Sequence, residues 1–397
     1  GAGGSAAETP RLGEAEQLCL YEACGLLLGC GIASEEASSA VLDELLALPM
    51  NELQLLDELG ATSSDAELME ARAADVAHRV SVIAAVSKGY QSLTSPVARG
   101  AFTRAMQLTL AALGPYGASA EVRGRSVTLL HRMVETFSID VLSYLTPALP
   151  HLLHPADPKE TADVTALLVQ MILKFKSAIA HSVSPVVGPV TAAIFSQVDK
   201  LEKAMAAEAR GGSVRTPLSE EGRERRALLR AYFSFLHAIV TNDLTPVLSD
   251  GNNFPLLLRA LTRLLQGCVE GPDLTVQRQC FLIVQRIVEH LAGKDDSFDD
   301  YVRASILPAS FTALAQPHFN LRDAAALALL EAVAGIQMAM LTKLGPAFLS
   351  HLHDVYLPSI SVSAEFNDEY ARLLTLGDPR QLRDFLRQRL DLASAES

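Results

Sequence analysis

Apolar residues recur along most of this chain with the period of an α-helix, and this pattern limits the fold more than any other feature of the sequence. In residues 164–179 and 276–291 the apolar positions are three or four residues apart, which places them on one face of a helix. Residues 225–240 are apolar over a wider arc, which indicates deeper burial. No stretch alternates apolar and polar residues for long enough to indicate a strand. The polar side of the 276–291 helix carries Gln277, Arg278, Arg286 and Glu289.

Proline and glycine residues separate the periodic segments. Because proline cannot continue a helix easily, we expect a helix end near Pro49, Pro115 and Pro346, among others. The sequence predicts helices over 14–30, 35–48, 50–59, 65–87, 97–113, 119–137, 141–153, 160–179, 188–209, 219–241, 253–268, 273–291, 298–315, 321–340, 346–357, 363–375 and 379–392.

These helices pair into hairpins whose second members resemble one another. The second helices begin at 125, 166, 225, 275 and 321, so the intervals are 41, 59, 50 and 46 residues. A HEAT-type helix pair occupies about 40–47 residues. The sequence therefore predicts an all-α, right-handed α-solenoid superhelix of HEAT-type hairpins over 14–397. Residues 1–13 are expected to be a linker or disordered end, and a flexible insertion is expected near 210–221.

Composition narrows the class of protein further. With 49% hydrophobic residues the chain can bury a large core, which excludes bulk disorder. Its net charge of −13 argues against indiscriminate binding to nucleic acid or anionic membrane. No apolar run reaches the roughly 18 residues of a membrane helix, since Pro185, Gly188 and Pro189 interrupt the best candidate, so no membrane association is expected. The first residue is Gly1 rather than Met, which indicates a fragment or a processed chain.

The five cysteines form an odd, unclustered set, which is typical of reduced intracellular thiols. Cys19, Cys24 and Cys30 lie close together without a C-x-x-C unit. The simplest interpretation places them as small apolar side chains on a buried helix face.

Motifs that would indicate catalysis are missing from the sequence. There is no phosphate-binding glycine loop, no G-x-S-x-G and no H-E-x-x-H. The histidine pairs His151/His154 and His351/His353 have no nearby cysteine, so no metal site and no cofactor are expected. The sequence therefore predicts a protein that is not an enzyme.

Charge is distributed unevenly. Residues 1–70 hold one basic and fourteen acidic residues, whereas residues 71–133 hold eight basic and two acidic ones, for a net charge of +6. A solenoid brings equivalent positions into register, so basic residues on successive helices can form a track for a phosphate backbone recognised by shape. The same residues can instead lie along the helix surface and pair with local acids, and the sequence leaves both interpretations open.

Several short motifs resemble the exportin-T family, tRNA export receptors of the importin-β-like superfamily. They run in order along nearly the whole chain, and match the family poorly only in 31–70 and 199–222. No single motif is specific, but their collinear order makes the resemblance strong, and it covers the C-terminal part of the family. The matching strings are Ser87-Lys88-Gly89-Tyr90, Arg125 with Leu130-His131-Arg132-Met133, Lys174-Phe175-Lys176, Arg230-x-Tyr232-Phe233-x-Phe235-Leu236, Cys280-Phe281 with Val288-Glu289 and Gly293-Lys294-Asp295, then Phe298, Asp300, Val302, Pro308 and Phe311, and last Tyr356-Leu357-Pro358-Ser359.

The resemblance implies a cargo receptor that binds mature tRNA together with Ran-GTP, contacts nucleoporins, and shuttles as a monomer between nucleus and cytoplasm. In the family, the main Ran-GTP contact lies in the N-terminal arch, which this chain does not match. The candidate phosphate contacts within matching motifs are Lys88, Arg125, Arg132, Lys174, Lys176 and Arg230. Three more, Arg99, Arg104 and Arg123, depend on the local excess of positive charge alone. The alternative is a HEAT-repeat scaffold or karyopherin that binds a protein partner instead of RNA.

Overall fold

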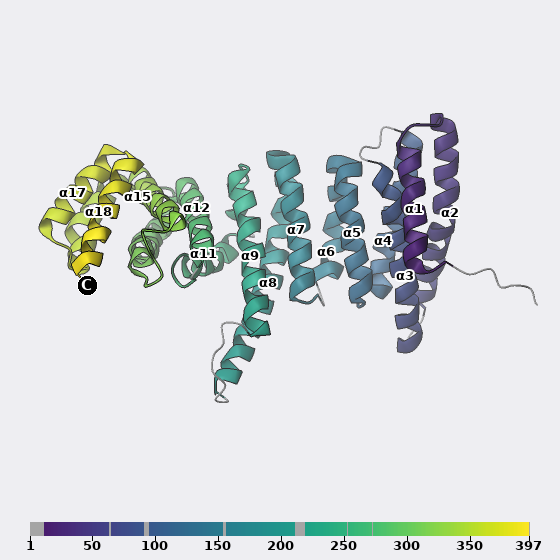
Figure 1. Cartoon of the computed structure of the whole chain (residues 1–397), viewed down its shortest axis with the longest axis horizontal. Coiled ribbons are helices and arrows are strands. Elements are labelled where there is room, and N and C mark those ends of the chain that lie inside the picture. The colour runs from purple at the N-terminus through teal and green to yellow at the C-terminus, as the bar shows by residue number, and fades with distance from the viewer. Residues whose placement is uncertain are drawn as a thin grey trace, which may run out of the picture. The chain divides into compact units, whose positions relative to one another are not determined.

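The computed structural model describes residues 12–62, 65–90, 95–153, 156–210, 219–251, 253–271 and 273–396. Their regular secondary structure consists of α-helices and short 3-10 and π segments (Figure 1). The predicted linker, apart from residues 12 and 13, and most of the predicted insertion lie outside the described residues.

The elements of the first half are α1 (Glu14–Gly29), α2 (Glu35–Gly60), α3 (Ala66–Val86), η1 (Ser87–Gly89), α4 (Pro96–Tyr116), α5 (Ala120–Phe137), η2 (Ser138–Val141), α6 (Leu142–Leu153), α7 (Pro158–Phe175), η3 (Lys176–Ile179) and α8 (Ala180–Arg210). Those of the second half are α9 (Glu220–Thr241), α10 (Thr245–Leu248), α11 (Phe254–Val269), α12 (Leu274–Leu291), α13 (Asp296–Tyr301), η4 (Val302–Ile306), α14 (Leu307–Thr312), η5 (Ala313–Ala315), α15 (Ala324–His351), η6 (Leu352–Tyr356), α16 (Leu357–Ser359), α17 (Ala364–Leu376) and α18 (Pro379–Glu396).

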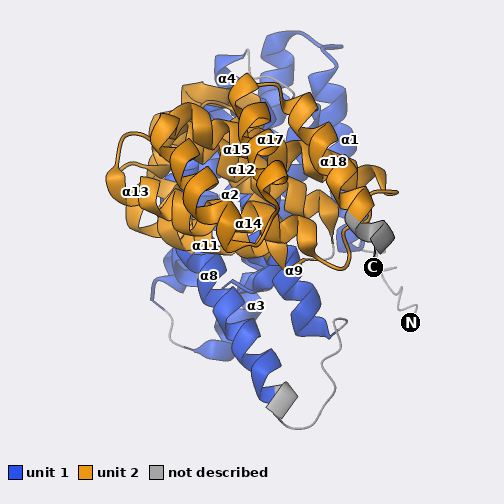
Figure 2. Ribbon diagram, turned by 90° about the vertical axis from the view of Figure 1, so that its left-hand side faces the viewer, with its two compact units in different colours: residues 1–171, 192–228 blue, residues 172–191, 229–397 orange. Residues whose placement is uncertain are grey.

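The chain divides into two compact units (Figure 2). Unit 1 comprises residues 1–171 with 192–228, and unit 2 comprises residues 172–191 with 229–397. In unit 1 each helix packs against the helix two positions along the chain: α1 on α3, α3 on α5, α2 on α4 and α4 on α6. Unit 1 is therefore a stack of helix pairs in two layers, with α1, α3 and α5 in one layer and α2, α4 and α6 in the other.

Unit 2 is built on the same plan. Helix α12 packs against α15 and α15 against α18, while α11 packs against both α12 and α14. The stacking of successive helix pairs in each unit confirms the predicted all-α solenoid of helical repeats.

Helix starts are fixed by side chains that cap the first turn. Ser95 and Ser119 accept hydrogen bonds from backbone N–H groups of α4 and α5, and Asp273 and Asp323 do so for α12 and α15. These oxygens satisfy N–H donors that have no partner within the helix. The predicted starts of most helices are correct because serine and aspartate precede the apolar pattern at these positions.

Two predicted helix breaks are wrong. Pro49 lies inside the continuous helix α2, and α8 begins at Ala180, so Pro185 and Pro189 lie inside it. An internal proline costs a helix roughly 3 kcal/mol. In α2 the buried stripe of Leu46, Pro49 and Leu53 continues through the proline, and its burial outweighs that cost.

Helix α1 approaches α3 and η1 unusually closely. A side chain at Gly25 would overlap the carbonyl of Val86, and one at Gly29 would overlap the carbonyl of Gly89. Glycine is therefore required at both positions for α1 to dock. Apart from Gly25, no residue of α1 is fully buried.

The prediction that three cysteines face a core is wrong. All five cysteines are free thiols, but Cys19, Cys24 and Cys30 are exposed, whereas Cys268 and Cys280 are buried. The first three lie on α1 and directly after it, and the far side of α1 has no helix packed on it within the described residues.

The hydropathy of two helical stretches is higher than the sequence analysis expected. By length and composition, Pro158–Ala207 and Ala324–Ser359 could cross a membrane, with 44% and 56% of their most apolar windows buried inside the protein. Pro158–Ala207 exceeds the expected limit because Pro185 and Pro189 do not break α8. Ala324–Ser359 runs through α15, η6 and α16, with a kink at Gly345, where φ is 64° directly before Pro346. Core helices pass the same test, so neither stretch by itself indicates a membrane.

Candidate nucleic-acid interface

The exposed face of α5 carries two of the predicted phosphate contacts. Arg125 and Arg132 are two helical turns apart and both project into solvent. Arg125 is 49% exposed and lies 3.5 Å from Glu121 one turn earlier, an arrangement worth only a few tenths of a kcal/mol. Within the described residues, the guanidinium of Arg132 has no ion pair or hydrogen bond. Arg132 is therefore free to contact a ligand on this face, and Arg125 is held only by its weak pair with Glu121.

Arg123 has a structural role instead. It is 4% exposed, and its Nε and Nη2 donate to the two carboxylate oxygens of Glu160 on α7 at 2.9 and 2.8 Å. Its Nη1 donates to the carbonyls of Gly117 and Ala118, at the turn between α4 and α5. Its donors are occupied inside the protein, so the predicted phosphate contact at Arg123 is wrong.

A second buried side chain repeats this role in unit 2. Gln277 lies four residues after the cap Asp273, as Arg123 lies four residues after Ser119. Its amide donates to the carbonyl of Gly271 at 2.6 Å and reaches His318 at 2.8 Å. The sequence placed Gln277 on the solvent side of α12, and its complete burial corrects that assignment.

Two further residues of unit 1 do not share the α5 face. Arg104 is exposed on α4, which lies in the other layer, and it pairs with Asp43 of α2 at 3.5 Å. Arg99 joins the start of α4 to the end of α5: it pairs with Asp140 at 2.7 Å and lies 5.7 Å from the ring centre of Phe137. The outer faces of two layers point in opposite directions, so Arg104 and Arg125 cannot line one surface.

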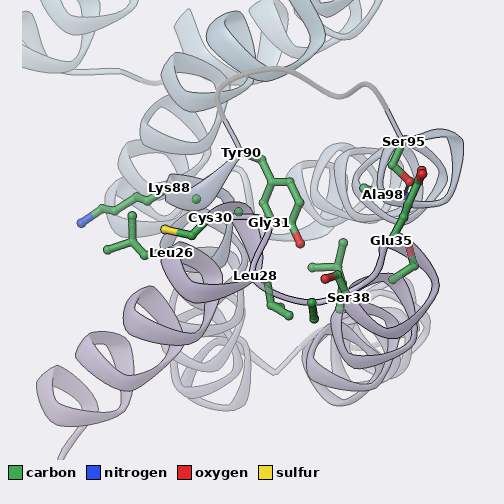
Figure 3. A pocket seen from close by; sticks show the side chains of 15 residues that line it. Leu26, Leu28, Cys30, Gly31, Glu35, Ser38, Lys88, Tyr90, Ser95 and Ala98 are labelled. Atoms are coloured by element: carbon green, nitrogen blue, oxygen red, sulfur yellow. Dashed lines mark hydrogen bonds between the residues drawn. The ribbon is translucent and has the colours of Figure 1, made fainter.

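Lys88 lies on the wall of a pocket of about 650 Å³ between the end of α1, η1 and the starts of α2 and α4 (Figure 3). Tyr90 projects into this pocket, and burial raises the pKa of its hydroxyl. The ammonium group of Lys88 points away from Tyr90 and pairs with Glu22 of α1. Lys88 therefore fastens α1 to η1 and does not present its charge to the pocket.

The three remaining predicted residues belong to unit 2. Lys176 is exposed in η3 with a φ of 52°, and has no ion pair within the described part of the chain. The Nζ of Lys174 lies 5.8 Å from the ring centre of Phe175. Arg230 is 61% exposed and pairs with Asp273 at 2.6 Å.

The positive window of residues 71–133 is largely neutralised by carboxylates, five of which lie outside the window. Six of its eight cations pair with carboxylates, and Arg72 donates to the carbonyl of Leu59. Three of those carboxylates belong to the acidic residues 1–70. The partners are Glu52, Glu22, Asp140, Asp43, Glu160 and Glu121. A count of charges along the sequence therefore overstates the field at this surface.

Arg278 is among the exposed cations of unit 2 that sequence reasoning did not select. Arg278 is exposed on α12 and has no ion pair among the described residues. It lies close to His237 of α9, whose pKa is lowered by burial and by this neighbouring charge. The helical period placed Arg278 on the polar side of α12, but no family motif selected it.

Metal ligation finds no support in the described residues. No three histidine, cysteine, aspartate or glutamate side chains come together there as metal ligands would. His154, a member of one predicted histidine pair, lies outside the described residues.

Stacked helix pairs with long exposed faces define an α-solenoid, a class of protein that binds partners over extended surfaces. The family profile of Exportin-T matches residues 12–394, nearly the whole chain, and the chain therefore belongs to the exportin-T family. It is 27% identical to Exportin-T of Danio rerio over 382 residues and to that of Homo sapiens over 381, covering 94% of this chain and 38% of each relative. Exportin-T of Arabidopsis thaliana is 27% identical over 380 residues, which cover 92% of this chain and 37% of that protein. The chain thus spans less than half the length of these relatives.

Proposed function

We propose that this chain forms part of a nuclear export receptor for mature tRNA, which binds its cargo together with Ran-GTP and releases it in the cytoplasm on GTP hydrolysis. Membership of the exportin-T family supports the class of protein and the cargo. The receptor passes the nuclear pore through nucleoporin contacts and acts as a monomer in this proposal.

The observation that carries the proposal for this chain is the exposed face of α5. Arg125 and Arg132 project from one stripe of a rigid helix, and the guanidinium of Arg132 has no partner within the described residues. Guanidinium groups fixed in this way suit phosphate oxygens, since each can donate two hydrogen bonds. The chain as a whole is acidic, so RNA without the matching shape gains little from these few cations.

In unit 2 we assign the same role to Lys174, Lys176 and Arg230, and add Arg278. Arg230 is paired with Asp273, so an RNA phosphate must compete with that carboxylate. Arg278 and Lys176 have no such competitor in the described residues. We therefore expect Arg278 and Lys176 to contribute more to RNA affinity than Arg230.

The test is a salt series of tRNA binding, measured by filter retention, for the unsubstituted receptor and two variants. Arg125→Gln with Arg132→Gln should weaken binding and lower the slope of log K against log salt by about two, about one for each phosphate that is no longer neutralised. Arg104→Gln is the matched control, because it removes an exposed cation from the opposite layer. Its slope should not change. Equal effects of both variants would contradict the assignment to the α5 face.

One observation favours the alternative that the chain binds a protein. Six of the eight cations in residues 71–133 are paired with carboxylates, which leaves a weaker positive field than the sequence predicts. In that case the chain should bind basic peptides tightly and show no preference for tRNA over other RNA.

A further inference from the structure

Three basic side chains of unit 2 lie close together where the end of α12 meets α15. His290 is in the last turn of α12, and Lys294 follows four residues later in the turn that leads to α13. Lys343 belongs to α15, which packs along α12 (Figure 1). We call His290, Lys294 and Lys343 the α12–α15 basic cluster.

Backbone packing at Gly293 fixes the two lysines beside each other. Gly293 has a φ of 79°, and a Cβ atom there would lie 2.9 Å from the carbonyl oxygen of Lys343. The left-handed conformation and the close approach both require glycine. The turn that carries Lys294 is therefore held directly against the backbone of Lys343. Both lysines also act on His290, whose pKa is lowered by burial and by these two positive charges.

The α12–α15 basic cluster has no counter-ion among the described residues. Lys294 and Lys343 are exposed, and within the described ranges neither forms an ion pair or a side-chain hydrogen bond. The imidazole of His290 has no hydrogen-bond partner in the same part of the chain. Two positive charges held together without an acid repel each other, so an anion bound between them would relieve a repulsion and gain an attraction.

Four of the five carboxylates between residues 289 and 300 are held by other groups. Asp295 caps α13 and accepts a hydrogen bond from the N–H of Phe298 at 2.9 Å. Asp299 accepts one from the N–H of Gly293 at 2.8 Å. These acids do not neutralise the cluster, but they place negative charge beside it. The other two form ion pairs of 2.9 Å, Glu289 with Arg286 and Asp300 with Arg303.

These surroundings restrict which anion fits the α12–α15 basic cluster. A phosphate monoester carries a charge of about −1.5 to −2 and three acceptor oxygens, which matches two ammonium groups and an imidazole. A nucleic-acid strand would bring a further phosphate with each nucleotide, and these would meet the flanking carboxylates. A peptide with a single phosphate and basic residues beside it would instead find opposite charges at both places.

We propose that the α12–α15 basic cluster binds a phosphoserine or phosphothreonine of a partner protein, in a segment with basic residues on either side of the phosphate. His290 and the two lysines donate hydrogen bonds to the phosphate oxygens, and the flanking carboxylates receive the basic side chains. Phosphorylation of the partner then switches the contact on. This proposal does not depend on tRNA binding.

The probe is a short fluorescein-labelled peptide with one phosphoserine at its centre and a lysine on either side. Its binding to the full-length receptor is measured by fluorescence anisotropy. The control peptides have serine or glutamate in place of the phosphoserine. The phosphopeptide should bind at least about tenfold more tightly than either control, since one charge-assisted hydrogen bond is worth about that factor.

Matched variants test whether the cluster is the site. Lys294→Gln with Lys343→Gln should weaken phosphopeptide binding about a hundredfold, about tenfold for each lysine. Arg322→Gln with Arg387→Gln is the control, because it removes two exposed cations of unit 2 that have no ion pair within the described residues. Its affinity should not change. All four side chains are exposed, so both variants should keep the melting temperature of the unsubstituted protein.

Competitors identify what carries the phosphate. Inorganic phosphate should displace the peptide only far above the peptide's Kd, and displacement at that concentration would rule out a peptide ligand. The tRNA affinity of the Lys294/Lys343 variant should equal that of the Arg322/Arg387 variant. A selective loss of tRNA binding in the lysine variant would assign the cluster to RNA and overturn the proposal. So would equal affinity for the phosphorylated and unphosphorylated peptides, or equal effects of the two variants on phosphopeptide binding.

Discussion

Arg123→Met tests most sharply whether a basic residue of this chain has a structural role or binds RNA. The substitution leaves Glu160, whose side chain is 15% exposed, without its bidentate partner, and leaves the carbonyls of Gly117 and Ala118 without a donor. Removing one member of a buried ion pair costs about 3–5 kcal/mol. Here Glu160 still accepts a hydrogen bond from the backbone N–H of Asp157, so we expect the lower end, about 3 kcal/mol.

The destabilisation should be local to the packing of α5 on α7. A repeat array need not unfold as a single unit, so amide hydrogen exchange is a better assay than one melting temperature. Exchange in α5 and the start of α7 should accelerate about a hundredfold for 3 kcal/mol, while exchange in α12 and α15 should not change. The double variant Arg123→Met with Glu160→Leu should recover most of the stability, because it buries no unpaired charge.

Binding of tRNA by the Arg123→Met protein distinguishes a structural role of Arg123 from a role in RNA binding. The folded Arg123→Met protein should keep the salt slope of tRNA binding, since the guanidinium is buried and cannot reach a phosphate on the surface. A stability decrease below about 1 kcal/mol together with a reduced salt slope would refute the structural role of Arg123.

Three further predictions concern packing, pH and the helix stop. Gly29→Ala should detach α1, because the new methyl group overlaps the carbonyl of Gly89, and proteolysis between α1 and α2 should accelerate. Gly100→Ala is the control: its methyl group meets open space, so it should stabilise α4 by about 0.5–1 kcal/mol. Hydrogen bonds to Asp354 and Asp368 raise the pKa of His353. The contact with Asp368 therefore stabilises α17 fully below the unfolded pKa of about 6.5, and this stabilisation is lost as pH rises through the folded pKa. Exchange in α17, corrected for its intrinsic rate, should be slower at pH 6 than at pH 8, and Asp368→Asn should remove most of the difference. Gly377→Ala should destabilise the end of α17 by about 1 kcal/mol, measured by thermal unfolding, since φ is 73° there.

The helical period predicted the fold class because burial of one stripe per helix repeats along the whole chain. Helix starts were predictable where a serine or aspartate cap precedes an apolar stripe, as at Ser119 and Asp273. Prolines inside helices were not predictable, because the packing that offsets the cost at Pro49 comes from helices distant in the sequence.

The candidate site was predicted less well, for a physical reason. A sequence gives the charge of a residue but not its partner. Arg123 and Arg125 are two residues apart, yet one is buried against Glu160 and the other is 49% exposed, because two residues turn a helix by about 200°. Arg104 was indistinguishable from Arg125 by local charge, and only the assignment of α4 and α5 to different layers separates them.

The most direct test of the central claim is the binding of mature tRNA to the receptor at its natural full length, with and without Ran loaded with GTP. We predict that Ran-GTP increases tRNA affinity, that tRNA increases Ran-GTP affinity by the same factor, and that tRNA affinity falls steeply with salt. Tight binding of basic peptides, with tRNA affinity equal to that of other RNA and unaffected by Ran-GTP, would contradict the account.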